Sequence, residues 1–112
     1  MGSADATEGE ELLALLGALG HPIRLRIVAA LVEGSTYVSQ LARDLDISRP
    51  LLHMHLQKLE AAGVVAGHME VSEDGRAMRY VTITDFSQLL DAVTVARAAA
   101  TLRDDSSKGR KT

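Results

Sequence analysis

The stretch from Tyr37 to Val65, YVSQLARDLDISRPLLHMHLQKLEAAGVV, decides how the rest of this 112-residue chain is arranged. In its first part, apolar residues recur at helical spacing and predict one helix: Val38, Leu41, Ala42 and Leu45. Three residues, 46–48, then interrupt the pattern. Ser48 can cap a second helix that begins near Arg49, and Pro50 is tolerated in a first helical turn because an amide there has no intrahelical partner. The stretch therefore predicts two helices joined by a short turn.

The second predicted helix has two unlike sides. Leu52, Leu56 and Leu59 are spaced by four and three residues, so they form one stripe that must face a core. The opposite side carries no acidic residue and consists of Pro50, His53, Met54, Gln57 and Lys58. Gly63 follows the last turn, where a glycine readily takes the left-handed conformation. A helix, a short turn and a second helix with an acid-free outer side form the geometry that places a recognition helix in the DNA major groove.

The hydrophobic period changes from 3.6 to 2 after Gly63, which predicts a β-hairpin. Alternation runs from Val65 to Ser72, stops at a turn of residues 73–75, and resumes from Met78 to Thr84. A hairpin directly after a recognition helix is a wing. Its Arg76 and Arg79 would lie beside the minor groove or the phosphate backbone. The alternative is an ordinary solvated turn whose arginines pair with Glu73 and Asp74.

Helices are also predicted before this stretch. One begins with acidic residues from Glu8 and carries a leucine stripe that serves either as plain core or as a contact with a second copy of the chain. Pro22 begins the next helix, which Gly34 ends, and His21 at the boundary is interpreted as a cap or a satisfied surface group. Ser35 and Thr36 are expected to cap the first helix of the pair.

A last helix is predicted after the hairpin, with Asp85 as its cap and Gln88 in capping-box spacing. It would be apolar on more than one side and so need cover from its own domain and from a partner subunit. One predicted face consists of Phe86, Leu89, Leu90, Val93, Ala96 and Ala100, and much of another consists of Val95, Ala99 and Leu102.

Composition limits the class of protein. The net charge is −3, but residues 21–84 hold seven Lys or Arg against seven Asp or Glu, so few phosphate contacts per subunit are expected, and two subunits would be needed. There is no cysteine, hence no disulfide or thiolate site. No nucleophile arrangement or phosphate-binding loop indicates an enzyme. With no signal peptide or membrane span apparent, the expected location is the cytoplasm, without membrane contact.

The predicted order of elements resembles the ArsR family of winged-helix bacterial repressors. LGALGHPIRLRIVAALVEG resembles the family's opening helices, and ISRPLLHMHLQKLEAAGVV resembles its recognition helix and the exit from it. The resemblance covers roughly residues 9–100. It implies a mainly α fold with a small β-hairpin, a winged helix-turn-helix of order α-α-α-α-β-β-α. It also implies a homodimer, joined through its first and last helices, that binds a pseudo-palindromic double-stranded DNA operator and represses transcription.

The chain departs from the family's metal sensors. Arsenic and cadmium sensors place cysteines where this chain has 39-SQLA-42, and zinc sensors place paired ligands on the last helix, where only Asp91 is found. His53 and His55 are two apart on a helix, so they cannot chelate one ion together. His53 is expected to face DNA, and His55 to be packed and hydrogen-bonded. No metal and no cofactor are therefore expected.

The sequence thus predicts a domain over residues 8–103 between disordered tails, 1–7 and 104–112. The residues expected to contact DNA are Ser48, Arg49, Pro50, Leu51, His53, Met54, Gln57, Lys58, Arg76 and Arg79. Those expected in the dimer interface are Leu12, Leu15, Leu16, Leu19, Leu89, Leu90, Val93, Ala96 and Ala100. The alternative function is a winged-helix protein-interaction or structural dimer without operator binding. A small-molecule effector could control either protein, but no residue marks its site.

Overall fold

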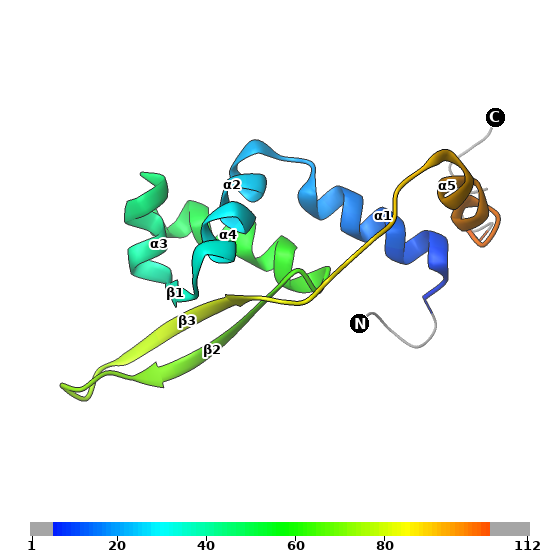
Figure 1. The fold of residues 1–112 in the computed structure, drawn as a ribbon. Helices are drawn as coiled ribbons and strands as arrows, with labels where there is room; N and C mark the ends of the chain where they lie inside the picture. The colour runs from blue at the N-terminus through cyan, green and yellow to red at the C-terminus, as the bar shows by residue number, and fades with distance from the viewer. Residues whose placement is uncertain (1–5, 104–112) are drawn as a thin grey trace.

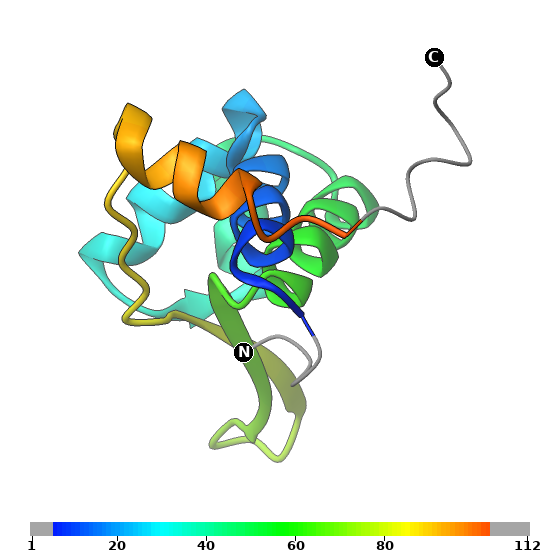
Figure 2. The same cartoon turned by 90° about the vertical axis from the view of Figure 1, so that its right-hand side faces the viewer.

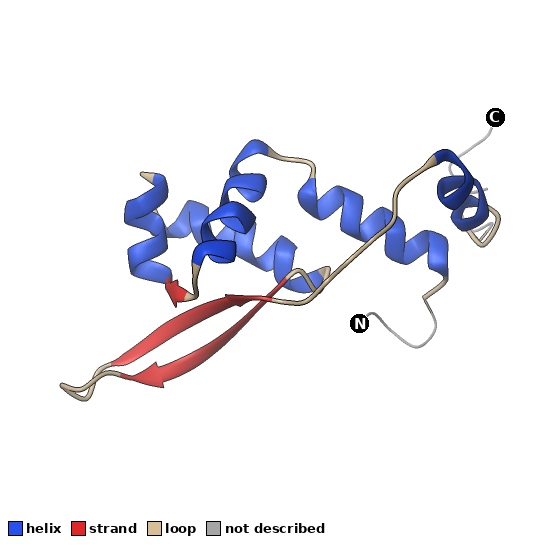
Figure 3. Ribbon diagram, in the orientation of Figure 1, coloured by secondary structure: helices blue, strands red, loops and turns tan. Residues whose placement is uncertain are grey.

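The fold is mainly helical, with one small sheet that projects from it (Figures 1 and 3). The computed structural model describes residues 6–103. The elements in chain order are α1 (Glu8–Leu19), α2 (Pro22–Glu33), β1 (Thr36–Tyr37), α3 (Val38–Leu45), α4 (Arg49–Ala61), β2 (Val65–Val71), β3 (Ala77–Ile83) and α5 (Ala92–Ala99). The predicted winged helix-turn-helix is confirmed, with one strand, β1, that the sequence did not predict.

The core lies where α2, α3 and α4 meet the base of the sheet. The leucine stripe of α4 is fully buried there, since Leu52, Leu56 and Leu59 expose 1% or less of their surface. The apolar face predicted for α3 is also confirmed. The other buried members of this cluster are Ala18, Ile27, Leu31, Val38, Leu41, Ala42, Val64, Val65 and Val81. Because three helices and the sheet share this one core, α4 is held with its opposite side outward.

Local caps fix the turn between α3 and α4 as predicted. The Ser48 hydroxyl accepts a hydrogen bond from the Leu51 amide at 3.2 Å, and Pro50 lies in the first turn of α4. Asp46 ends α3 in the left-handed region, at φ 57°. Gly63 has φ 78° and allows the chain to turn from α4 into β2. The start of the recognition helix is therefore set by the Ser48 cap, and the turn that follows it by the positive φ of Gly63.

The wing is an antiparallel pair, β2 and β3, with β1 on the far side of β3. Val65 faces Ile83 and Val71 faces Ala77 in the register, and Gly75 turns the tip at φ 88°. β1 pairs Thr36 with Val81 and Tyr37 with Tyr80. This strand makes Tyr37 the N-cap of α3, without a side-chain hydrogen bond, so the caps predicted from Ser35 and Thr36 are wrong. The backbone of 36–37 is instead extended because β3 offers it ladder partners.

The last helix is shorter than predicted. Asp91 is its N-cap, accepting a hydrogen bond from the Thr94 amide at 2.8 Å, and hydrogen bonds from Thr94 lower the pKa of the Asp91 carboxyl. Asp85 therefore does not cap α5, and Phe86, Leu89 and Leu90 are not helical. The chain here crosses from the sheet to α1 (Figure 3). The eight residues 84–91 can span about 26 Å when extended but only about 12 Å as a helix, so the non-helical chain reaches further.

α5 packs across the N-terminal part of α1, away from the main core (Figure 2). The Gly9 amide donates to the Thr101 hydroxyl at 2.6 Å, and a Cβ at Gly9 would overlap the Ala98 carbonyl. The residues that α5 buries are Thr94 and Ala98, not its larger apolar residues. Thr7 forms a capping box with Glu10 at the start of α1, so it belongs to the helix rather than to the expected tail. Of the other predicted tail residues, 1–5 and 104–112 lie outside the described residues.

The molecule is elongated, with the wing at one end and α5 at the other (Figure 1). Its extents are 56 × 27 × 27 Å and its radius of gyration is 16.8 Å. A compact domain of this length would have a radius of gyration of about 13 Å. The chain therefore does not close around a single core.

Candidate nucleic-acid interface

The outer side of α4 presents one row of polar side chains to solvent. Arg49, His53 and Gln57 are spaced by four residues, and all three are exposed. Pro50 and Met54 lie beside this row and are exposed as well, Met54 by 47%. Leu51 is only partly buried, and Ser48 is exposed although its hydroxyl is engaged by the cap. The predicted recognition surface is thus accessible, with a guanidinium near the helix N-terminus.

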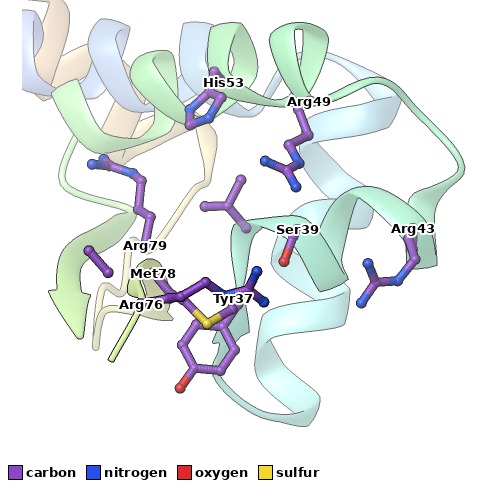
Figure 4. Close-up of a pocket in the computed structure, with 10 residues that line it drawn as sticks. Tyr37, Ser39, Arg43, Arg49, His53, Arg76, Met78 and Arg79 are labelled. Atoms are coloured by element: carbon purple, nitrogen blue, oxygen red, sulfur yellow. The ribbon is translucent and has the colours of Figure 1, made fainter. Parts of the chain in front are cut away.

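A hollow of about 450 Å³ lies between α4, the start of α3 and the wing (Figure 4). In Figure 4, Arg49 and His53 hang from α4 above the wing and the start of α3, and Arg79 reaches up from β3 toward α4. Four arginines line the hollow and no acidic residue does; its lining is Tyr37, Val38, Ser39, Arg43, Arg49, His53, Arg76, Ala77, Met78 and Arg79. This concave, cationic surface has the sign of charge that attracts phosphate. Tyr37, Ser39 and Arg43 were not predicted as site residues.

The four arginines differ in their partners. Arg43 donates to Gln40, and the Arg76 Nε lies 3.6 Å from Asp74 across a well-exposed pair. Arg76 thus makes the pair with Asp74 that the alternative interpretation named, and the exposure of this pair leaves its guanidinium accessible. Arg79 instead pairs with Glu60 of α4, with 2.6 Å between Nη2 and Oε2. Neither interpretation of the sequence named that partner, because Glu60 is nineteen positions away and on another element.

Behind the recognition row, α4 carries one buried polar residue. His55 is 2% exposed, and its Nδ1 accepts a hydrogen bond from the Arg24 Nε at 3.0 Å. The His21 ring lies 4.5 Å away, centroid to centroid, and its own Nδ1 accepts from the Ile23 amide as the cap of α2. Burial above all, then His21 and Arg24, lower the pKa of His55. The predictions that His55 is packed and that His21 is a cap are confirmed.

Lys58 lies away from the arginine-lined hollow. It lines a second hollow of about 380 Å³ that also includes Leu13, Ala14, Gly17 and Arg24. Among the recognition-side residues predicted on α4, Lys58 is thus the one on the α1 side. Lys58 therefore does not share the surface that Arg49 and His53 line.

The predicted dimer residues separate into two groups. Leu12 is 7% exposed, and Leu15 and Leu19 are partly buried against the core of their own chain. The others are exposed: Leu16 by 40%, Leu89 by 68%, Leu90 by 55% and Val93 by 73%, together with Ala96 and Ala100. Leu13, at 58%, and Leu102, at 42%, add to them although neither was predicted in the interface. Large apolar side chains thus gather at the α1–α5 end without cover.

Two further properties concern only residues 6–103. No three metal-ligating side chains of the His, Cys, Asp and Glu types gather there. No single helix in this range is long and apolar enough to cross a membrane, and α1 with α2 would reach that length only as a pair bent by 91°.

Comparison with known proteins identifies the family. The model of the family described as "Bacterial regulatory protein, arsR family" matches residues 21–66. An uncharacterized HTH-type transcriptional regulator of Methanocaldococcus jannaschii is 36% identical over 74 residues, which are 66% of this chain and 77% of that protein. The HTH-type transcriptional regulator CmtR of Mycobacterium tuberculosis is 42% identical over 72 residues, 63% of this chain and 58% of that protein. The match thus spans little more than half of CmtR.

Solved structures of regulators with the same fold are also similar to this chain. The transcriptional repressor BigR of Xylella fastidiosa is 28% identical with a TM-score of 0.57, and the alignment covers 80% of this chain and 81% of BigR. The homodimeric winged helix-turn-helix DNA-binding domain of a possible ArsR-family regulator of Mycobacterium bovis has a TM-score of 0.61. That domain is 21% identical, with 88% of this chain and 84% of that one covered, and shows the fold alone. With the helix-turn-helix, the wing and these relatives together, the chain belongs to the ArsR family of DNA-binding transcriptional regulators.

Proposed function

We propose that this protein is a homodimeric repressor that binds a pseudo-palindromic operator in double-stranded DNA. The observation that carries the proposal is the exposed row of α4 beside a hollow lined by four arginines and no acid. A major groove admits a helix such as α4, and the phosphates beside that groove would face the hollow. Arg49 is the candidate for two hydrogen bonds to guanine, with His53 and Gln57 in the same row.

Apolar contacts would add to base reading. Met54 and Pro50 donate no hydrogen bond, but an apolar side chain in the major groove can contact a thymine methyl group. Ser48 and Leu51 flank this row at the start of α4, Lys58 would meet a phosphate at its other flank, and Arg76 would contact the backbone from the wing. Few of these contacts are charged, so one subunit alone would bind weakly.

The second subunit is supported by the α1–α5 end. A monomer rarely leaves so many large apolar side chains together in water, and here they share one end of an elongated chain. Pairing two such ends about a twofold axis would cover Leu16, Leu89, Leu90 and Val93. It would also present two copies of α4 to half-sites about one helical turn, roughly 34 Å, apart. Leu12 is buried within its own chain, so it would support the interface from behind and not touch the partner.

The test combines binding and assembly. A mobility-shift assay would use the DNA upstream of the protein's own gene at two salt concentrations, and sedimentation would give the oligomeric state. We expect a dimer whose sequence-dependent binding weakens as salt rises, because phosphate contacts release counterions. A monomer would refute the proposed homodimer. A dimer that does not bind DNA even at low salt would refute operator binding. The second of these results would support the alternative of a winged-helix interaction dimer, which the exposed apolar Met54 favours.

A further inference from the structure

The wing is joined to the recognition helix by one partly buried ion pair. The Arg79 Nη2 of β3 donates to the Glu60 Oε2 in the last turns of α4 at 2.6 Å. The arginine and carboxylate side chains are 37% and 29% exposed, each less than its counterpart in the other arginine–carboxylate pairs of the described residues. The Arg79 Nε is moreover buried without any hydrogen-bond partner. In this position Arg79 leaves its Nε unpaired while its Nη2 bonds to Glu60. The contact with Glu60 therefore determines where the guanidinium lies.

A glycine makes room for this pair. A Cβ at Gly67 of β2 would lie 2.7 Å from the Glu60 Oε2 and 2.9 Å from the Arg79 Nη2. Both distances are shorter than van der Waals contact, so a side chain at 67 would force the ends of Glu60 and Arg79 to shift. No positive φ requires a glycine here. Gly67 thus leaves the space that the ion pair occupies.

The opposite face of the same hairpin is held by β1, through contacts that do not involve Glu60 or Arg79. Tyr37 packs edge-on against Tyr80 at 5.2 Å between ring centroids, and its hydroxyl lies 3.4 Å from the Glu70 carboxylate. The β1–β3 pairing at Tyr37 and Tyr80 secures that side. Among residues 6–103, Glu60–Arg79 is the one ion pair between α4 and the hairpin. Without it, the α4 side of the wing would lose this polar link to the recognition helix.

We infer that Glu60, Arg79 and Gly67 form a clamp that sets the distance between wing and recognition helix, so that Arg79 is a positioning residue and not a phosphate contact. The inference rests on the proposed DNA binding and refines the role expected for Arg79. A rigid wing spares the entropy of ordering it when DNA binds. Arg76, which is well exposed at the tip, remains the wing residue that meets the backbone.

The two roles of Arg79 predict opposite signs for Glu60→Gln. If Arg79 contacted phosphate, this change would free it and remove a negative charge near DNA, so binding would tighten. If the clamp positions the wing, binding weakens, and we expect about threefold to tenfold. Fluorescence anisotropy with the upstream duplex measures this directly. Glu73→Gln is the matched control, because it removes the same charge from the exposed wing tip without touching the clamp, and it should tighten binding slightly.

Gly67→Ala gives the same test without altering charge. Its methyl group should separate Glu60 from Arg79 and weaken binding similarly, while the melting curve followed by circular dichroism reports whether the fold persists. In a double-mutant cycle, Glu60→Gln with Arg79→Gln should bind no worse than either single variant. Tighter binding by Glu60→Gln, or additive losses, would overturn the clamp. Failure of the wild-type protein to bind the duplex would instead refute the proposed function.

Discussion

The two ends of this molecule differ in where their apolar side chains lie. On α4, Leu52, Leu56 and Leu59 are buried to 1% exposure or less and the outer side is mostly polar. At the α1–α5 end, the contact between helices is made by Gly9, Ala98 and Thr101, while Leu89 and Val93 are mostly exposed. The first region is complete within one chain. The second has its small residues inside and its large ones outside, the arrangement of a surface that a second chain would cover.

This difference separates stability from assembly. Changes in the α4 core should unfold the chain, whereas changes on the outer side of α5 should leave a folded chain that no longer pairs. The ion pairs Glu8–Arg97 and Glu10–Arg103 at this end join side chains that are 34–62% exposed, so they contribute little to holding α5 in place. Backbone contact at Gly9 is the stronger constraint.

The largest effect is expected from Leu52→Ala. Leu52 is 0% exposed, and removing its side chain should lower the free energy of unfolding by about 2–5 kcal/mol through lost burial and a cavity. Chemical denaturation followed by circular dichroism measures this. Leu25→Ala, at a leucine that is 56% exposed on α2, should cost much less. Equal losses at both positions would show that the core is not where the structure places it.

Val93→Asp tests the other end. Val93 is 73% exposed in the single chain, so the substitution should leave the fold intact. If a partner covers it, two unpaired carboxylates would be buried, and the dimer should weaken by about a hundredfold or more. Sedimentation at several concentrations gives the dissociation constant. Val32→Asp, at a valine 66% exposed on α2, is the matched control and should dimerise normally. Unchanged pairing in Val93→Asp would remove α5 from the interface.

Arg49→Ala and Arg43→Ala divide the arginine-lined hollow. Arg49→Ala should cost about 1–3 kcal/mol of binding free energy and relax the preference at one base pair per half-site. Arg43→Ala should weaken binding to all sequences alike and reduce the salt dependence, because Arg43 would meet phosphate only. Binding to a panel of single-base operator variants distinguishes the two. A uniform loss in Arg49→Ala would rule out its contact with a base.

The smallest expected effect is the loss of folding stability at acidic pH. Because the pKa of His55 is lowered in the folded chain, the unfolded chain takes up this proton first as the pH falls. Stability should therefore decline below about pH 6.5, by at most about 1.4 kcal/mol per pH unit for one proton. His55→Gln, which can still accept from Arg24, should flatten this decline between pH 6.5 and 5. A decline of the same slope in this variant would assign the effect to other groups.

Elements that depend on neighbouring residues were predictable. Pro22 and Ser48 mark helix starts, Gly63 and Gly75 take the left-handed turns that their positions suggest, and the leucine period of α4 identified its buried side. Each of these features depends on chemistry within about four residues, which is the range of a helical turn. The candidate DNA-contacting row could be named for the same reason, as the side opposite the leucines.

Features that depend on distant residues could not be read from the chain. Arg79 lies near acids at the wing tip, yet it pairs with Glu60, because folding brings β3 beneath α4. Asp85 and Asp91 are both plausible caps, but residues 84–90 connect β3 to α5 without a helix and only Asp91 caps one. β1 exists only because β3 passes beside Thr36 and Tyr37. Local sequence thus specified the helix-turn-helix and its outward side, whereas contacts across the fold set the position of the wing and left the apolar side of α5 exposed.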